Sequence, residues 1–293
     1  GYQKRGRVPL AIEDTCPLIF PMRLVKSPGE IAMMRQATKI SAMAHNRARE
    51  FAQPGVYEYQ VQAEIEHIFR KEGAIGIAYP SIVASGENAC ILHYIENNRQ
   101  LQDNELLLID AGCSYGYYNG DITRTFPVGG KFTSEQKALY EIVLEAQLNA
   151  IAEVQAGKPY NEFHDMAVCV IVQGLLDLGL LKGDLEEIIK EEKYKPFYMH
   201  RTGHWLGLDV HDVGVYKHNE ETWQNLQPGH IVTVEPGIYI SPHIKPAEGQ
   251  PEVPDNWKGI GIRIEDDVLV TNDGHDILTS DVPKSVEEME RTL

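Results

Sequence analysis

The chain repeats one order of patterns, and this repeat limits its possible folds more than any other feature. Each half begins with apolar residues at helical spacing and continues with apolar, β-branched runs that predict strands. The predicted helices are residues 27–51, 57–71, 133–155, 161–178 and 184–192, and the predicted strands are 81–84, 89–94, 106–109, 117–128, 231–240 and 259–271. Because either half alone would leave an apolar sheet face bare, we predict one α+β domain of two pseudo-symmetric halves, with helices outside an antiparallel sheet.

Two helix starts are marked by capping boxes. Ser27 stands at an N-cap position with Pro28 at the first helical position and Glu30 two residues later. Thr133 and Gln136 repeat this spacing before the first helix of the second half. In such a box the two side chains satisfy each other's free backbone N–H groups, so both helix starts are predicted locally.

Residues 1–24 lack regular periodicity and contain three prolines. We interpret this segment as a linker without a helix, arriving from a missing N-terminal domain, and residues 25–293 as the folded domain. The linker carries many apolar side chains, which we expect to lie on the body of the domain. They are Ile12, Leu18, Ile19 and Phe20.

Charge and cysteine content exclude several functions. The 43 acidic and 27 basic residues give a net charge of −16, which repels phosphate backbones, so we expect no nucleic-acid partner. The best apolar run, 166–172, is far shorter than the roughly 18 residues of a membrane span, so we expect no membrane partner. Four widely spaced cysteines indicate reduced thiols of a cytoplasmic protein. They are Cys16, Cys90, Cys113 and Cys169.

Two carboxylates follow a strongly apolar run. Asp110 ends the run 106–109, and Asp121 lies eleven residues later. A tight turn centred on Tyr115–Gly116 would place these two acids directly opposite each other, with Cβ atoms about 4.5–5.5 Å apart. Carboxylates that close repel unless a cation lies between them. The alternative is a capped turn plus a surface acid.

The second half offers matching groups. Glu235 ends a β-branched run, and Glu265 shares a strand face with Arg263, which is also compatible with a plain ion pair. Three histidines fall within twelve residues beside glycines, and another ends a predicted strand; a lone histidine in such a place is usually structural, but three together favour a site. The histidines are His200, His204, His211 and His93.

Four carboxylates and one imidazole form an oxygen-rich donor set without thiolates. This set suits Mn²⁺ first, with Co²⁺, Fe²⁺ or Zn²⁺ as alternatives. Carboxylates can bridge two ions about 3.5–4 Å apart, and such pairs activate water for hydrolysis. The sequence thus favours metal-assisted hydrolysis.

The chain carries five motifs in a fixed order: Asp110–Gly112, Asp121–Val128, His204–Asp212, Glu235–Gly237 and Gly261–Asp267. Together they resemble the motifs of the pita-bread metallopeptidases, and most closely those of the aminopeptidase P branch of that family. The resemblance covers about residues 22–290. One departure is Arg201–Gly203, where some members have smaller or more apolar residues; it leaves the flanking histidines in register.

The resemblance implies a two-metal centre, most often of Mn²⁺, in which Asp121 and Glu265 bridge the ions. It implies three substrate-handling histidines, and it assigns Tyr239 and Arg263 to hydrogen bonds with Asp110. The implied metal ligands are Asp110, Asp121, His204, Glu235 and Glu265, and the implied substrate-handling histidines are His93, His200 and His211.

The activity implied by the resemblance is that of an exopeptidase that removes the first residue from peptides with proline second. A hydroxide bridging the metals would attack, and Glu235 would take the proton from the water. Xaa-Pro dipeptidase, methionine aminopeptidase and a non-catalytic binding module are the alternatives. The family's separate N-terminal domain assists oligomerisation and site closure, so any homo-oligomer is expected to depend on it.

Overall fold

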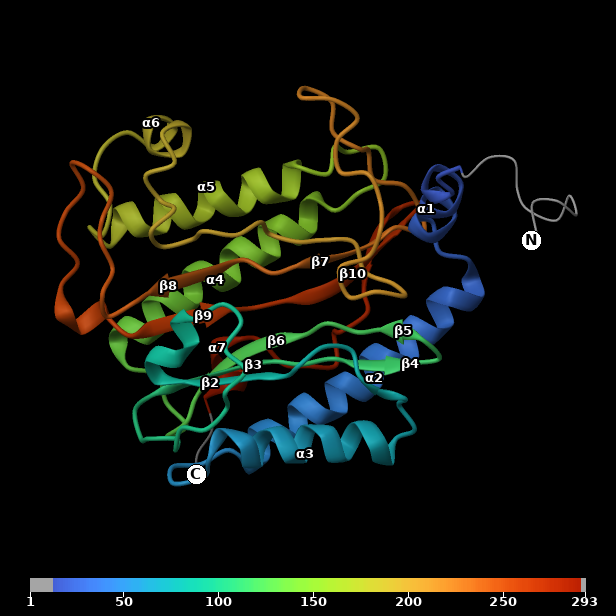
Figure 1. The fold of residues 1–293 in the computed structure, drawn as a ribbon. Coiled ribbons are helices and arrows are strands. Elements are labelled where there is room, and N and C mark those ends of the chain that lie inside the picture. Colours follow the sequence, from blue (N-terminus) through green and yellow to red (C-terminus); the bar gives the residue numbers. More distant parts are fainter. Residues whose placement is uncertain (1–12, 291–293) are drawn as a thin grey trace, which may run out of the picture.

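The computed structural model describes residues 13–290 and confirms the predicted α+β architecture. Strands cross the middle of the molecule, with one helix pair on each side of them (Figure 1). The first half contributes α2 (Pro28–Phe51) and α3 (Glu58–Lys71). The second half contributes α4 (Ser134–Glu153) and α5 (Glu162–Asp177). The helices lie outside the strands, as predicted.

Both predicted capping boxes are present. The Ser27 hydroxyl accepts the Glu30 N–H at 3.5 Å, and the Glu30 carboxylate accepts the Ser27 N–H at 2.7 Å. Thr133 and Gln136 make the same reciprocal pair at 3.3 and 3.0 Å. The first helix of each half therefore starts where its local sequence predicts.

The strands form short antiparallel sheets. In the first half β3 lies between β2 and β6, and β4 lies between β1 and β5; in the second half β10 lies between β11 and β7, and β8 pairs with β9. The strands are β1 (Gly76–Ile77), β2 (Ile82–Ser85), β3 (Leu106–Asp110), β4 (Cys113–Tyr115), β5 (Tyr118–Asn119), β6 (Thr123–Pro127), β7 (Ile231–Val234), β8 (Gly237–Ile240), β9 (Ile260–Arg263), β10 (Asp266–Thr271) and β11 (Gly274–Ile277). The smaller helices are α1 (Cys16–Leu24), α6 (Leu185–Lys190) and α7 (Val286–Met289), with 3₁₀ turns η2 (Gly86–Cys90) and η3 (Asp255–Trp257).

A buried arginine joins the two halves. Arg124 on β6 donates to the Glu265 carbonyl oxygen at 2.6 Å and to the Asp266 carboxylate at 2.7 Å. Thr123 also forms a backbone bridge with Glu265. The centre of the first half is therefore fixed to the point where β9 gives way to β10.

The predicted strand at 89–94 is wrong. Its first residues belong to the 3₁₀ turn η2, and the rest is irregular. The buried Glu58 carboxylate explains the irregular path, because it accepts hydrogen bonds from the Ser85 backbone, the Tyr94 hydroxyl and the Arg99 backbone at 2.7–2.9 Å. The segment wraps around this one acid instead of forming a ladder.

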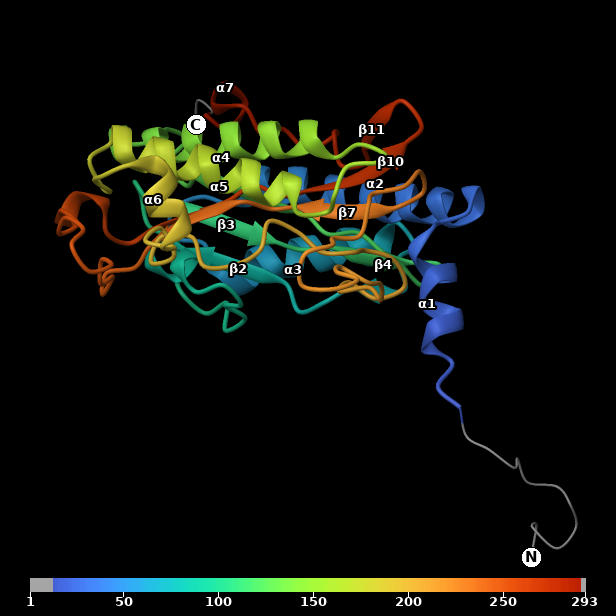
Figure 2. The same ribbon diagram turned by 90° about the horizontal axis from the view of Figure 1, so that it is seen from above.

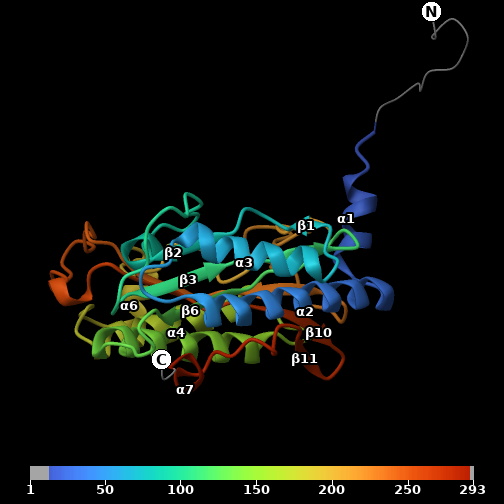
Figure 3. The same cartoon turned by 90° about the horizontal axis from the view of Figure 1, so that it is seen from below.

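The expectation of a linker without a helix is also wrong within the described residues, since α1 begins at Cys16. Pro17 lies in the first turn, where its missing N–H costs nothing. The expected packing of apolar side chains on the body fails for Leu18 and Ile19, which are 71% and 44% exposed. Figures 2 and 3 show α1 projecting from the body beyond the start of α2. Residues 1–12, including Ile12, lie outside the described residues.

Within residues 13–290, none of the helices combines the length and the apolar character that crossing a bilayer requires.

Candidate active site

The site forms where strands are interrupted. The predicted strand 231–240 is divided at Glu235, because β7 pairs with β10 while β8 pairs with β9. The strand predicted at 259–271 is divided near Glu265, where the chain makes the matching change of partner. Asp121 likewise falls between β5 and β6. At each break a side chain leaves the ladder and can point into the space between the halves.

The predicted pairing of Asp110 with Asp121 is wrong by two positions. Asp110 faces Thr123 on β6, because the turn is centred on Gly116 and Tyr117. Both turn residues have positive φ, 57° and 71°, which is the conformation of the tightest hairpin turns. Both acids nevertheless contact the hydroxyl group of Tyr79.

His204 is placed beside Glu235 by backbone pairing. The Thr233 N–H donates to the His204 carbonyl at 3.0 Å, and the Glu235 N–H donates to the Thr202 carbonyl at 2.8 Å. Gly203 allows this approach, since a Cβ there would lie 2.0 Å from the Thr233 carbonyl oxygen. The segment thus runs along β7 like an added strand.

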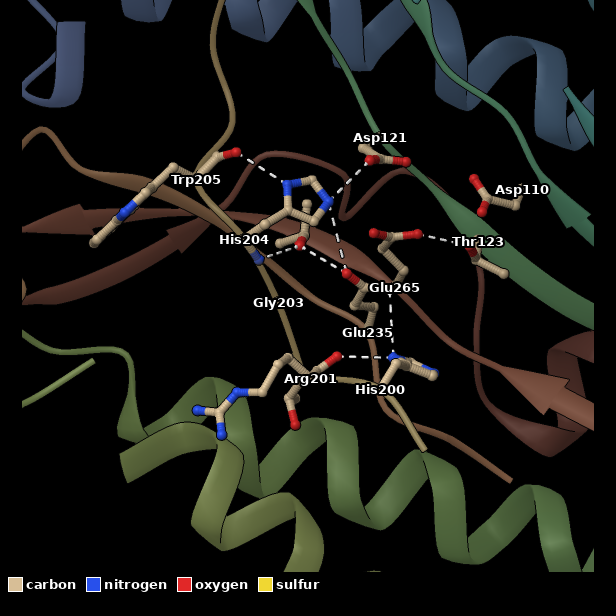
Figure 4. Close-up of polar contacts among 12 residues, drawn as sticks. Asp110, Asp121, Thr123, His200, Arg201, Gly203, His204, Trp205, Glu235 and Glu265 are labelled. Carbon is tan, nitrogen blue, oxygen red and sulfur yellow. Dashed lines mark hydrogen bonds and ion pairs between the residues drawn. The ribbon is translucent and has the colours of Figure 1, made fainter. Parts of the chain in front are cut away.

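Four of the five proposed ligands, all except Asp110, come close together (Figure 4). The His204 Nε2 atom lies 3.4 Å from Asp121 Oδ2 and 3.6 Å from Glu235 Oε1. His204 Nδ1 donates to the Trp205 carbonyl at 2.9 Å, which leaves Nε2 free to be a ligand. Asp121, His204 and Glu265 each offer a donor atom within 4.8 Å of the other two.

The charge of this cluster fits a divalent cation. Burial raises the pKa of Glu235 to about 7, and it raises the pKa values of Asp121 and Glu265 as well. Burial opposes charging His204, but the carboxylates Asp121 and Glu235 outweigh it and raise the His204 pKa to about 9. A cation would favour ionised carboxylates and a neutral imidazole, which is the ligand form of each.

Arg263 forms the predicted contact with Asp110. Its NH2 group donates to Asp110 Oδ2 at 2.7 Å, and its NH1 group donates to the Tyr239 hydroxyl at 3.0 Å. The predicted hydrogen bond from Tyr239 to Asp110 is absent; the Tyr239 hydroxyl instead contacts His200 Nε2 at 2.8 Å. His200 Nδ1 donates to the Arg201 carbonyl at 2.8 Å, so both ring nitrogens of His200 are engaged.

The other two histidines line the same cavity of about 950 Å³ as the acidic cluster. The His211 ring stands edge-on to the His204 ring, with centroids 4.4 Å apart. No hydrogen bond from the His93 or His211 ring to another residue is found in the described part of the chain. All the candidate ligands and all three outer histidines therefore face one cavity.

Three residues missed by sequence reasoning also contact the cluster. The Tyr79 hydroxyl lies within hydrogen-bond distance of two acids, Asp110 Oδ1 at 2.7 Å and Asp121, so its one hydrogen is shared between them or donated to one of them. The Thr123 hydroxyl donates to Glu265 at 2.6 Å, and Asp267 accepts the Asp121 N–H at 2.9 Å. Thr123 and Asp267 lie inside two of the five family motifs, Asp121–Val128 and Gly261–Asp267. Tyr79 lies shortly before β2, and nothing in the neighbouring sequence marks it as a site residue.

Interrupted strands bring carboxylates and an imidazole into one buried cluster that could hold a metal ion, and residues 32–272 match the model of metallopeptidase family M24. The chain belongs to this family.

The similar proteins include Xaa-Pro aminopeptidases. The chain is 48% identical to Xaa-Pro aminopeptidase of Escherichia coli, with 100% of this chain and 64% of that protein covered. It is also 48% identical to Xaa-Pro aminopeptidase of Haemophilus influenzae, with 96% of this chain and 64% of that protein covered. The solved structure of Pseudomonas aeruginosa aminopeptidase PepP superposes with a TM-score of 0.92 at 51% identity, covering 99% of this chain and 64% of that chain. The chain thus spans about 64% of the length of these relatives.

Proposed function

We propose that residues 25–293 are the catalytic domain of an Xaa-Pro aminopeptidase that holds two divalent ions, with Mn²⁺ as the first choice. Similarity to enzymes of that name over essentially the whole chain supports the activity. The carboxylate-rich donor set supports a hard or borderline ion. A related structure is of Zn-substituted Escherichia coli aminopeptidase P with product, so metal identity needs measurement.

One observation carries the proposal: His204 and four carboxylates line a cavity large enough for a short peptide. The proposed ligands are Asp110, Asp121, His204, Glu235 and Glu265. When bound, the ions would polarise water and offset the negative charge that develops during peptide hydrolysis.

The residues of the chain have distinct proposed roles. Glu235, which lines the cavity beside His204, would accept a proton from the attacking water. His211 and His93 would donate hydrogen bonds to the developing oxyanion and to the proline side of the substrate. His200 would act through Tyr239, because both of its ring nitrogens are already engaged.

Substrate recognition follows from charge. The acidic cluster would attract the α-ammonium group of the peptide. An Xaa-Pro bond has no amide N–H, so a site for it needs no acceptor at that position. A peptide with proline in the second position is therefore the proposed substrate. The proposed location, the cytoplasm, rests separately on the four widely spaced cysteines.

The proposal is tested by metal analysis coupled to peptide assays. We expect two ions per chain, hydrolysis of Ala-Pro-Ala, and loss of activity on chelation. Glu265→Gln should abolish activity at saturating metal, whereas Asp273→Asn, on an exposed turn, should not. Full activity after exhaustive chelation would exclude the metal mechanism.

Three peptides separate the alternatives. Cleavage of Ala-Pro but not Ala-Pro-Ala would indicate an Xaa-Pro dipeptidase. Preference for Met-Ala-Ser would indicate a methionine aminopeptidase. A metal-free protein that cleaves none of the peptides would be a binding module.

A further inference from the structure

An aromatic wall made of Tyr160, Tyr216 and Trp223 lines part of the cavity. Tyr160 is buried at its centre, and its hydroxyl donates to the Gly203 carbonyl at 2.7 Å. Its ring contacts Tyr216 edge-on at 4.9 Å and lies nearly parallel to Trp223 at 6.4 Å. The wall is thus attached to the chain between His200 and His204, so its position relative to the cluster is fixed.

The strand pairing around Trp223 also holds the wall in place. Lys217 and Trp223 form an antiparallel bridge, and the Gln224 N–H donates to the Tyr216 carbonyl at 2.9 Å. The Tyr160 N–H then donates to the Gln224 carbonyl at 2.9 Å. These hydrogen bonds attach the hairpin of residues 216–224 to the segment that precedes α5.

Two cations lie against this wall. The Arg201 guanidinium carbon is 5.1 Å from the centre of the Trp223 ring, and Lys217 Nζ is 4.2 Å from it. Arg201 also donates to the side-chain carbonyl of Asn161. Figure 4 shows the Arg201 side chain extending away from Glu235 and Glu265.

The cavity is therefore lined by groups of both charges. Its lining includes four carboxylates and two cations, Arg201 and Lys217. The guanidinium carries five N–H donors in one plane, and one of its nitrogens donates to Asn161, so further donors remain for a carboxylate. Lys217 Nζ donates to the Glu220 carbonyl at 3.4 Å and keeps further N–H donors as well.

We propose that Arg201 and Lys217 form a subsite that binds a carboxylate of the peptide substrate. This inference rests on the proposed function. With the α-ammonium group beside the acidic cluster, the carboxylate comes either from the peptide's C-terminus or from an acidic first side chain. In both cases the subsite contributes to substrate binding and not to bond cleavage.

Two pairs of uncharged and charged peptides distinguish these sources. Ala-Pro-Ala is compared with its C-terminal amide, and Glu-Pro-Ala amide is compared with Gln-Pro-Ala amide. We expect KM to be about 10-fold lower for the charged member of one pair, as a charge-assisted hydrogen bond provides. The difference should shrink as salt is raised, because both cations are at the surface.

The variants assign the effect to the subsite. Arg201→Gln should remove most of the KM difference with kcat within about 2-fold of wild type, and Arg201→Lys should restore part of it. Lys217→Gln should act in the same direction. Lys195→Gln, which removes a cation outside the cavity, is the control.

Equal KM values within both pairs in the wild type would overturn the subsite, as would a difference that survives in the double variant. If none of the peptides is cleaved by the metal-loaded protein, the proposed function fails instead. Calorimetric binding of the same pairs then tests the subsite alone, and equal affinities overturn it.

Discussion

Replacing Arg263 tests how the protein holds Asp110 in place. The Arg263 side chain is 4% exposed and makes three side-chain hydrogen bonds, to Asp110, to the Tyr239 hydroxyl and to the Thr123 hydroxyl. Thr123 in turn donates to Glu265. Arg263→Ala therefore removes the partner of a buried carboxylate and releases the hydroxyl groups on both sides of it.

The size of the effect follows from these contacts. Removing one partner of a buried ion pair costs about 3–5 kcal/mol of folding stability. Loss of a residue that orients a metal ligand weakens metal binding by about 10–100-fold. Arg263 has two opposite effects on metal binding. It orients the ligand Asp110, which favours binding, and its positive charge repels the cation, which disfavours binding. We expect orientation to dominate, because Arg263 contacts the ligand Asp110 directly and the ligand Glu265 through Thr123.

Metal titration by calorimetry measures the result, with thermal unfolding of the metal-free protein measured alongside. We expect weaker metal binding in Arg263→Ala and partial recovery in Arg263→Lys, which keeps the charge but loses the planar fork. Arg35→Ala removes an arginine from an exposed ion pair with Asp276 and is the control. Metal binding in Arg263→Ala that equals or exceeds wild type would refute the reasoning.

Three further predictions concern the surroundings of the site. His93→Ala and His211→Ala should lower turnover by about 10²–10⁴-fold with metal content unchanged, and loss of an ion in either variant would make that histidine a ligand. Arg23→Ala removes one of the two cations paired with Asp212, which follows His211, and leaves only a buried lysine, so kcat should fall by about 3–10-fold while the Arg35→Ala control stays at wild type; unchanged kcat would show that α1 does not position the site. Adding an upstream domain of the kind that the family resemblance implies should lower KM without changing the metal count, and equal KM values would separate that domain from the site.

Local interactions explain what the sequence predicted well. The capping boxes at Ser27 and Thr133 depend on residues three positions apart, so the start of each helix can be read from the sequence. Asp110, Glu235 and Glu265 stood out because a carboxylate beside apolar, β-branched residues is costly to bury without a partner. These three residues could therefore be recognised as candidate site residues from the sequence alone.

Only the tertiary structure decided where the strands break and how they pair. One long apolar run was predicted where β7 and β8 stand, because periodicity does not show that the two parts pair with different strands. The register between Asp110 and Thr123 depended on positive φ at Tyr117, which nothing in the flanking residues signals. The irregular path of 86–99 depended on Glu58, a distant residue in the sequence.

The site itself shows the same division. The sequence by itself determined the chemistry, since the kinds of donors present are fixed by the amino acids. The structure decided the contacts: Tyr79 joins Asp110 to Asp121, and Tyr239 reaches His200 instead of Asp110. These contacts join segments tens of residues apart, and their geometry is set by how the strands and loops of each half pack together, which no local pattern encodes.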